Sequence, residues 1–114
     1  MKLSAHFDRS EFACACGCGF DTVDTDLLDA LEALRAHFER PVRITSGARC
    51  AKYNAEVGGS PNSQHPLGRA ADVVVDHIEP ELVHEYFRDH PGGLGSYSNF
   101  THIDTRNERA RWTG

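Results

Sequence analysis

The sequence lacks several features that would assign it to common classes of protein. No apolar run approaches the roughly 20 residues that a membrane-spanning helix needs, so we expect no membrane span. The opening residues, MKLSAHFDRSEF, contain no apolar core of a secretory signal, which predicts synthesis in the cytoplasm without a signal peptide. The 12 Lys and Arg residues are scattered and are outnumbered by 17 Asp and Glu residues. Nucleic acid is therefore not expected as a partner, because phosphate binding depends on clustered positive charge.

Internal repeats, low-complexity tracts and glycine-rich phosphate loops are also absent. Without such a loop between a strand and a helix, the nucleotide-binding folds lose their main signature. The composition is otherwise that of a globular protein, with 39% hydrophobic and 25% charged residues. A chain of 114 residues can build one hydrophobic core, so we predict a single domain over residues 1–114 and a monomer.

Hydrophobic spacing and turn residues predict three helices and four strands. The expected helices span 25–39, 49–57 and 81–89, and the expected strands span 42–45, 70–75, 94–97 and 100–105. In the third helix we expect a buried set that consists of Leu82, Val83, Tyr86 and Phe87. This order of elements predicts an α+β domain in which helices pack on a small mixed or mainly antiparallel sheet.

Four cysteines fall into two unequal groups, with Cys14, Cys16 and Cys18 close together and Cys50 far away in the sequence. Cysteines two residues apart are poorly placed to bridge each other. Three states are therefore open: a structural zinc held by four thiolates, a disulfide from Cys50 to one of the other three, or free thiols. The first three cysteines belong to residues 1–22, an N-terminal segment that we expect to pack on the domain. A redox or regulatory protein built on these thiols is a further hypothesis, but it leaves the histidine pattern described next unexplained.

The residues typical of metal chemistry concentrate in the stretch from Ser63 to Asp72 and in His102-Ile103-Asp104. Imidazole nitrogen and carboxylate oxygen are good zinc ligands, and three protein ligands leave a fourth position for water, as catalysis requires. His65 lies in the loop that enters the strand of Asp72, and His102 lies on another predicted strand. We therefore predict that His65, Asp72 and His102 form one catalytic zinc site.

A longer pattern around these residues resembles the M15 zinc peptidases of the D-Ala-D-Ala carboxypeptidase type, which are structurally related to the Hedgehog signalling domain. The pattern comprises Ser46-Gly47-Ala48-Arg49, Tyr53-Asn54, Val57-Gly58-Gly59, Ser63-x-His65-x-x-Gly68-x-Ala70-x-Asp72 and Gly92-Gly93-Leu94-Gly95-x-Tyr97-x-x-Phe100-x-His102-x-Asp104-x-Arg106. The resemblance implies a Hedgehog/DD-peptidase-like fold and a zinc peptidase that hydrolyses an amide bond in bacterial peptidoglycan stem peptides. Carboxypeptidase and endopeptidase action are both open, and the enzyme would reach the cell wall after lysis or phage delivery.

Residue by residue, the resemblance implies zinc binding by the His65, Asp72 and His102 triad. It also implies that Arg49 orients or polarises the substrate and that Ser63 supports the site. A guanidinium suits a peptide carbonyl or a terminal carboxylate, although a salt bridge that closes the helix start is an equal alternative for Arg49. The remaining residues expected to bind substrate or to support the site are Gln64, Tyr97 and Asn99. Tyr97 could donate a hydrogen bond to the developing oxyanion.

Asn99 departs from the family pattern. Many relatives carry Glu or Asp at this position, three residues before the last zinc ligand, where the carboxylate acts as general base. Because an amide cannot take up the proton, we predict Asp104 as the base; a hydrogen bond that fixes the His102 imidazole is the alternative role. A third option is that Asp104 only pairs with Arg106 or Arg49. Because the usual base is missing, a second hypothesis stays open: a catalytically weak, zinc-stabilised module that binds the cell wall.

Overall fold

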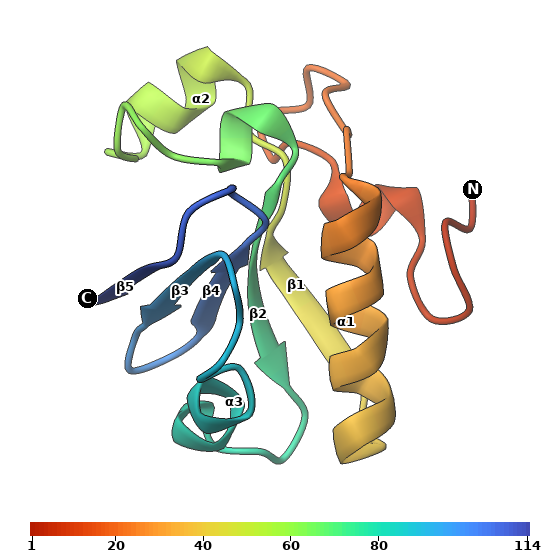
Figure 1. Cartoon of the computed structure of the whole chain (residues 1–114). Helices are drawn as coiled ribbons and strands as arrows, with labels where there is room; N and C mark the ends of the chain where they lie inside the picture. Colours follow the sequence, from red (N-terminus) through yellow and green to blue (C-terminus); the bar gives the residue numbers. More distant parts are fainter.

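The computed structural model describes residues 1–114 and shows three helices packed against a five-stranded sheet (Figure 1). The helices are α1 (Thr25–Phe38), α2 (Ala51–Glu56) and α3 (Pro80–Tyr86). The strands are β1 (Val42–Ser46), β2 (Ala70–Val75), β3 (Gly93–Ser96), β4 (Thr101–Asp104) and β5 (Ala110–Thr113). Two short 3-10 helices, η1 (Arg9–Phe12) and η2 (His65–Leu67), complete the elements. None of the helices has the length and apolar character to span a membrane.

The sheet has the strand order β1-β2-β4-β3-β5. The β1–β2, β2–β4 and β3–β4 pairs are antiparallel, whereas β5 runs parallel to β3 at the edge. The expected α+β class with a mixed, mainly antiparallel sheet is therefore confirmed. β3 and β4 form the expected hairpin, in which the Tyr97 amide donates to the Phe100 carbonyl across Ser98-Asn99.

The two faces of the sheet have opposite chemistry, because successive side chains on a strand point to opposite sides. Ala71, Val73 and Ile103 are fully buried in the hydrophobic core together with leucines of α1 and with Val83 of α3. Asp72 pairs with His102 across β2 and β4, and both lie at alternate positions to those core residues. The hydrophobic face anchors the sheet on the helices, so polar side chains gather on the other face.

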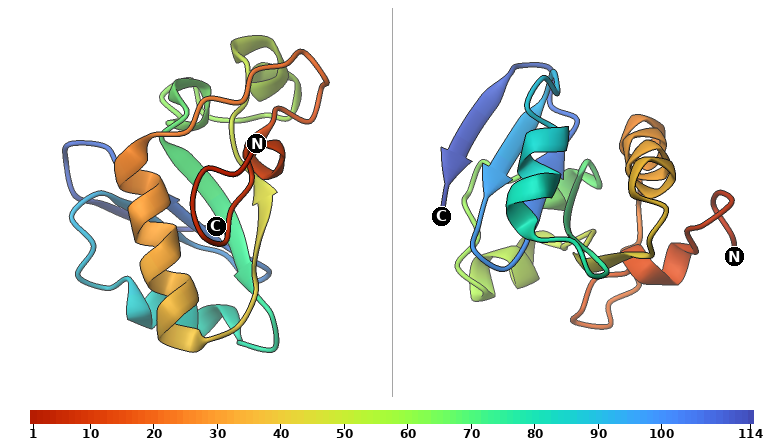
Figure 2. Two further views of the ribbon diagram at one scale, coloured as in Figure 1. Left: turned by 90° about the vertical axis from the view of Figure 1, so that its right-hand side faces the viewer. Right: turned by 90° about the horizontal axis from the view of Figure 1, so that it is seen from below.

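The N-terminal segment joins the same core. Phe7 and Phe12 are each only 1% exposed and belong to the core cluster. The Ala48 amide donates to the Phe12 carbonyl, and a side chain at Gly47 would overlap the Phe12 backbone. The N-terminal segment therefore lies against the chain that leads into α2. In the right-hand view of Figure 2 this segment lies beyond α1, and the C-terminus is on the opposite side of the molecule.

The helix expected over 81–89 ends at Tyr86, and two further features differ from the expectations from sequence. The strand β5 was not predicted, because its four residues show no clear hydrophobic run. They include Arg111, and every second side chain is exposed. Leu82 was expected to be buried but is 52% exposed. Helical spacing explains the difference. Val83 and Phe87 are four residues apart and share the helix face that meets the core, whereas Leu82 lies outside that face.

Leu34 and Leu82 form a matched pair of helical leucines for a test of the core. Leu34→Ala removes a side chain with 0% exposure, so the free energy of unfolding should fall by about 2–5 kcal/mol. Leu82→Ala should change it by no more than about 0.5 kcal/mol, because the side chain is half exposed. Urea denaturation followed by circular dichroism measures both values. Equal losses in the two variants would contradict this assignment of the core.

Candidate functional site

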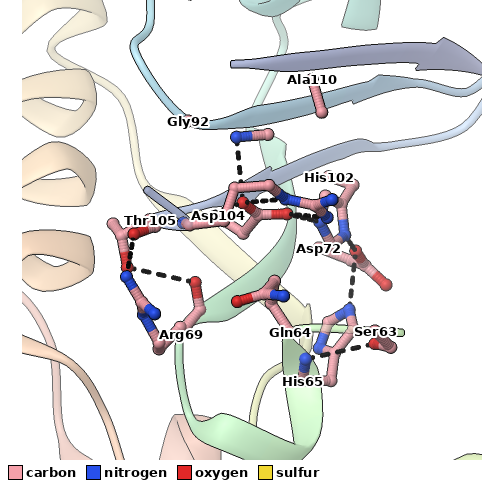
Figure 3. Close-up of polar contacts among 12 residues, drawn as sticks. Ser63, Gln64, His65, Arg69, Asp72, Gly92, His102, Asp104, Thr105 and Ala110 are labelled. Atoms are coloured by element: carbon pink, nitrogen blue, oxygen red, sulfur yellow. Dashed lines mark hydrogen bonds and ion pairs between the residues drawn. The ribbon is translucent and has the colours of Figure 1, made fainter. Parts of the chain in front are cut away.

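Three buried polar side chains meet at one end of the polar sheet face. The antiparallel register sets Asp72 of β2 opposite His102 of β4, and η2 brings His65 to the same place (Figure 3). His65 Nε2 lies 3.3 Å and His102 Nδ1 3.0 Å from Asp72 Oδ1. All three residues are at least 93% buried. One atom from each residue lies within 4.8 Å of the others, which is close enough for a shared metal ion.

In each imidazole, the nitrogen that points away from the site makes a hydrogen bond. This bond indicates whether the other nitrogen carries a proton or a lone pair. His65 Nδ1 lies 2.6 Å from the Gly47 carbonyl, and because a carbonyl only accepts, Nδ1 must be the donor. In the neutral ring His65 Nε2 then carries a lone pair, and this buried atom has no hydrogen-bond partner. His102 Nε2 lies 2.8 Å from Asp104 Oδ2, so the neutral His102 ring directs the lone pair of Nδ1 toward Asp72. A cation among these atoms would satisfy all of them.

The electrostatics of the site also favour positive charge. Burial raises the pKa of the Asp72 carboxyl, but the close His102 and His65 imidazoles outweigh this effect and hold the pKa at about 2. Burial lowers the pKa of His102, but its contacts with Asp104 and Asp72 raise it above the ordinary value. Asp72 is thus a carboxylate at neutral pH, and the surroundings of His102 stabilise a positive charge at this point.

Asp104 lies behind His102, on the side of the ring away from Asp72 (Figure 3). The residue is 0% exposed and both of its carboxylate oxygens are engaged. Oδ1 accepts from the Gly93 amide at 2.9 Å and from Arg106 Nε at 2.9 Å, and Oδ2 accepts from Arg106 Nη2 at 2.7 Å. Burial raises the pKa of Asp104, but His102 and Arg106 hold it well below its usual range. A side chain at Gly93 would overlap this carboxylate, which explains the glycine.

Arg49 holds the second oxygen of the Asp72 carboxylate. Its Nη2 lies 3.2 Å from Asp72 Oδ2, Nη1 donates to Asn54 Oδ1 and Nε donates to Ser46 Oγ. The Arg49 side chain is 15% exposed, so the ion pair is largely shielded from water. Asn54 is 5% exposed and donates in turn to the Ser60 carbonyl. Arg49 is thus anchored from three sides and still reaches the site.

A cleft of about 620 Å³ opens over the three buried side chains. Its walls comprise the loop residues Val57, Gly58, Gly59, Ser60, Asn62 and Ser63, the aromatic residues Tyr97, Phe100 and Trp112, and the two arginines Arg49 and Arg106. Tyr97 and Phe100 stack with ring centroids 4.3 Å apart, and Arg106 lies over the Trp112 ring at 5.1 Å. Among carboxylates, only Asp72 lines the cleft.

The other site residues expected from the sequence lie at different distances from this cleft. Ser63 lines it and accepts a hydrogen bond from the His65 amide at 3.2 Å. Gln64 instead faces an adjoining hollow of about 600 Å³, next to Pro66 and Leu67. Asn99 is exposed at the tip of the β3–β4 hairpin and is not among the cleft residues.

Trp112 and Asn54 were not assigned a role from the sequence. Trp112 lies on β5, and its Nε1 donates to the Tyr97 hydroxyl at 3.0 Å. A side chain at Gly95 would overlap the Trp112 indole, so the glycine of β3 makes room for it. Trp112 is the single tryptophan of the chain, which could have drawn attention to it. Its position, however, depends on the pairing of β5 with β3, which no local sequence pattern predicts. Asn54 belongs to the Tyr53-Asn54 element of the sequence pattern, which could have drawn attention to it.

The four cysteines form a separate group outside this cleft. Cys14, Cys16, Cys18 and Cys50 are all free thiols, and none of them lines the cleft. Their sulfur atoms lie within 4.8 Å of one another.

Comparison with known families gives one match that covers most of the chain. A sequence model of the family described as Peptidase M15 matches residues 5–104. This range includes all of the site residues described above except Arg106 and Trp112. No similar protein is found among curated proteins.

Proposed function

The chain belongs to the peptidase M15 family, and we propose that it is a zinc-dependent peptidase that hydrolyses an amide bond in peptidoglycan peptides. One observation carries the proposal: His65 Nε2, Asp72 Oδ1 and His102 Nδ1 converge, buried, at the floor of a cleft. Two imidazoles and one carboxylate are a ligand set suited to catalytic zinc, with a position left for water or substrate. The mixed sheet with its packed helices fits this family.

The unpartnered His65 Nε2 supports the fit of these residues to zinc. Without a cation, this lone pair would face the Asp72 carboxylate across 3.3 Å. We assign His65, Asp72 and His102 as the zinc ligands on this ground. Zinc bound there would lower the pKa of a water ligand to about 7 and polarise the scissile carbonyl.

For Asp104 we propose a positioning role through His102. Its hydrogen bond to His102 Nε2 selects the tautomer that presents Nδ1 to the metal, and Arg106 and the Gly93 amide fix the carboxylate in turn. A general base must reach the proton that it removes, within hydrogen-bond distance or through one water. Asp104 is 0% exposed and lies on the other side of the imidazole from the cleft, which favours the positioning role over the base role.

Arg49 has two roles in this proposal. Its contact with Asp72 Oδ2 leaves Oδ1 directed at His65 and His102, so the guanidinium orients the carboxylate ligand. It also lines the cleft, where its charge can attract a peptide carbonyl or a terminal carboxylate. Arg106 also lines the cleft, with its guanidinium paired to Asp104. Two arginines in the wall and Asp72 as the only lining carboxylate suit a peptide that bears carboxylates, as peptidoglycan stem peptides do.

Tyr97 is the candidate donor to the oxyanion. Its hydroxyl oxygen already accepts from Trp112 Nε1, so the hydroxyl proton remains available for an oxygen in the cleft. Stacking on Phe100 restricts the ring. We propose that Tyr97 stabilises the negative charge that develops on the substrate carbonyl oxygen.

Digestion of purified peptidoglycan tests this function and identifies the bond. Zinc-loaded protein should release fragments that mass spectrometry detects, with free D-Ala from a carboxypeptidase or separated crosslinked peptides from an endopeptidase. His65→Ala should lower the rate to background, since it removes a buried zinc ligand. His77→Ala is the matched control, because His77 is 74% exposed and should leave the rate unchanged. Zinc-loaded protein that binds sacculi without cutting them would instead establish the cell-wall-binding module.

Asp104→Asn separates the two roles of that carboxylate. In the positioning role, the variant should bind zinc about 10- to 100-fold more weakly and recover most of its kcat at saturating zinc. In the base role, zinc affinity should hold while kcat at saturating zinc falls by about 10²- to 10⁴-fold. Competition with a metal chelator and steady-state kinetics give the two values. The second pattern would contradict our assignment.

A further inference from the structure

Four sulfur atoms converge where the N-terminal segment meets α2. Cys14, Cys16 and Cys18 lie in the loop before α1, and Cys50 immediately precedes α2. Cys14 Sγ lies 3.4 Å from Cys16 Sγ and 3.9 Å from Cys50 Sγ, and Cys16 Sγ lies 3.7 Å from Cys50 Sγ. The loop and α2 are neighbours in both Figure 1 and Figure 2. We call Cys14, Cys16, Cys18 and Cys50 the cysteine cluster.

The backbone of the loop is shaped to bring alternate residues to one point. Gly17 and Gly19 have φ angles of 81° and 91°, in the left-handed region that favours glycine. The Gly17 amide donates to the Cys14 carbonyl, and the Cys14 amide donates to the Phe20 carbonyl at 2.7 Å. These bonds close the loop on itself, so that three side chains with i, i+2 spacing face the same centre.

Backbone amides also point at the sulfur atoms. The Cys50 amide donates to Cys14 Sγ at 3.4 Å, and the Tyr53 amide donates to Cys50 Sγ at 3.4 Å. Hydrogen bonds to sulfur favour the thiolate, which is the form that binds metals. The donors come from α2 and its N-cap, whereas Cys14 belongs to the N-terminal segment. Both parts of the chain thus contribute to one arrangement.

We propose that the cysteine cluster binds one structural zinc ion, separate from the site at His65, Asp72 and His102. Zinc–sulfur bonds of about 2.3 Å in a tetrahedron place the sulfur atoms about 3.8 Å apart. The three Sγ–Sγ distances among Cys14, Cys16 and Cys50, at 3.4, 3.7 and 3.9 Å, scatter about that value. Four thiolates fill the tetrahedron and leave no position for water, which is typical of a structural rather than a catalytic ion.

A disulfide accounts for the cluster less well. One bond from Cys50 would use a single partner and leave two thiols of the loop unused, although all four sulfur atoms converge. Zinc uses every member of the cluster.

The ion would crosslink the two parts of the chain that frame the catalytic arginine. Cys50 follows Arg49 directly, and the Ala48 amide is already bonded to the Phe12 carbonyl. A metal bond from Cys50 to residues 14–18 would fix the start of α2 from the other side. The cluster therefore stabilises the N-terminal segment and the backbone that carries Arg49, and it takes no part in the reaction itself.

Metal counting and cobalt substitution test the proposal on the full chain, purified under reducing conditions. Wild-type protein should contain two zinc ions per chain by elemental analysis, and His65→Ala and the double variant Cys16→Ser/Cys18→Ser should each contain one. Cys16 and Cys18 are exposed, so their replacement does not disturb the core. Cobalt(II) loaded into wild type or His65→Ala should give a thiolate-to-cobalt charge-transfer absorption, and the double cysteine variant should lack it.

Each variant also controls for the other site. A charge-transfer band that persists in His65→Ala shows that the thiolate site is independent of the histidine site. A His65→Ala protein that contains no zinc at all would overturn the proposal. Two other results would overturn it too: a Cys50 disulfide detected by mass spectrometry in protein purified under reducing conditions, or iron in place of zinc. The cobalt titration of His65→Ala needs no cysteine substitution, so the proposal stays testable if the double variant does not fold.

Discussion

The pairing of Asp72 with His102 across β2 and β4 is the contact on which the rest of the site depends. It sets a buried carboxylate against a buried imidazole on the polar face of the sheet, 3.0 Å apart. Burial of these groups is costly unless each polar atom has a partner. Asp104 and Arg49 supply partners on the outer sides, and His65 presents an unpartnered nitrogen to the centre. The lone pairs and the carboxylate at the centre still lack a positive partner, which a zinc ion would provide.

The fold provides this arrangement by dividing the sheet into two faces. The apolar face packs on α1 and α3, which holds β2 and β4 in register, and the alternation of side chains then places the polar residues together. Glycines at 93 and 95 leave room on β3 for the Asp104 carboxylate and the Trp112 indole. Asp72 and His102 therefore lie on paired strands, His65 lies on η2, and much of the cleft wall comes from loop residues.

Local patterns explain why part of this could be predicted from the sequence. The strand at 70–75 has the same bounds in the structure, since a β-branched run between turn residues is a strong signal. The α+β class followed from element order. The grouping of His65, Asp72 and His102 followed from ligand chemistry, strand geometry and the resemblance to the M15 peptidases. Asp104 follows His102 by two residues, so strand parity predicts that the two side chains share a face. It could not show that Asp104 lies behind the ring, because that depends on side-chain rotamers and on Arg106. β5 and Trp112 depend on a parallel pairing with β3, which leaves no local trace.

The central claim is that a zinc ion is held by His65 Nε2, Asp72 Oδ1 and His102 Nδ1 at the floor of the cleft. Anomalous diffraction at the zinc absorption edge, from crystals of the zinc-loaded protein, tests it most directly. We expect a peak about 2.0–2.2 Å from each of these three atoms, with His102 Nε2 still hydrogen-bonded to Asp104. The absence of a peak among the three residues, or ligation through His102 Nε2, would contradict it.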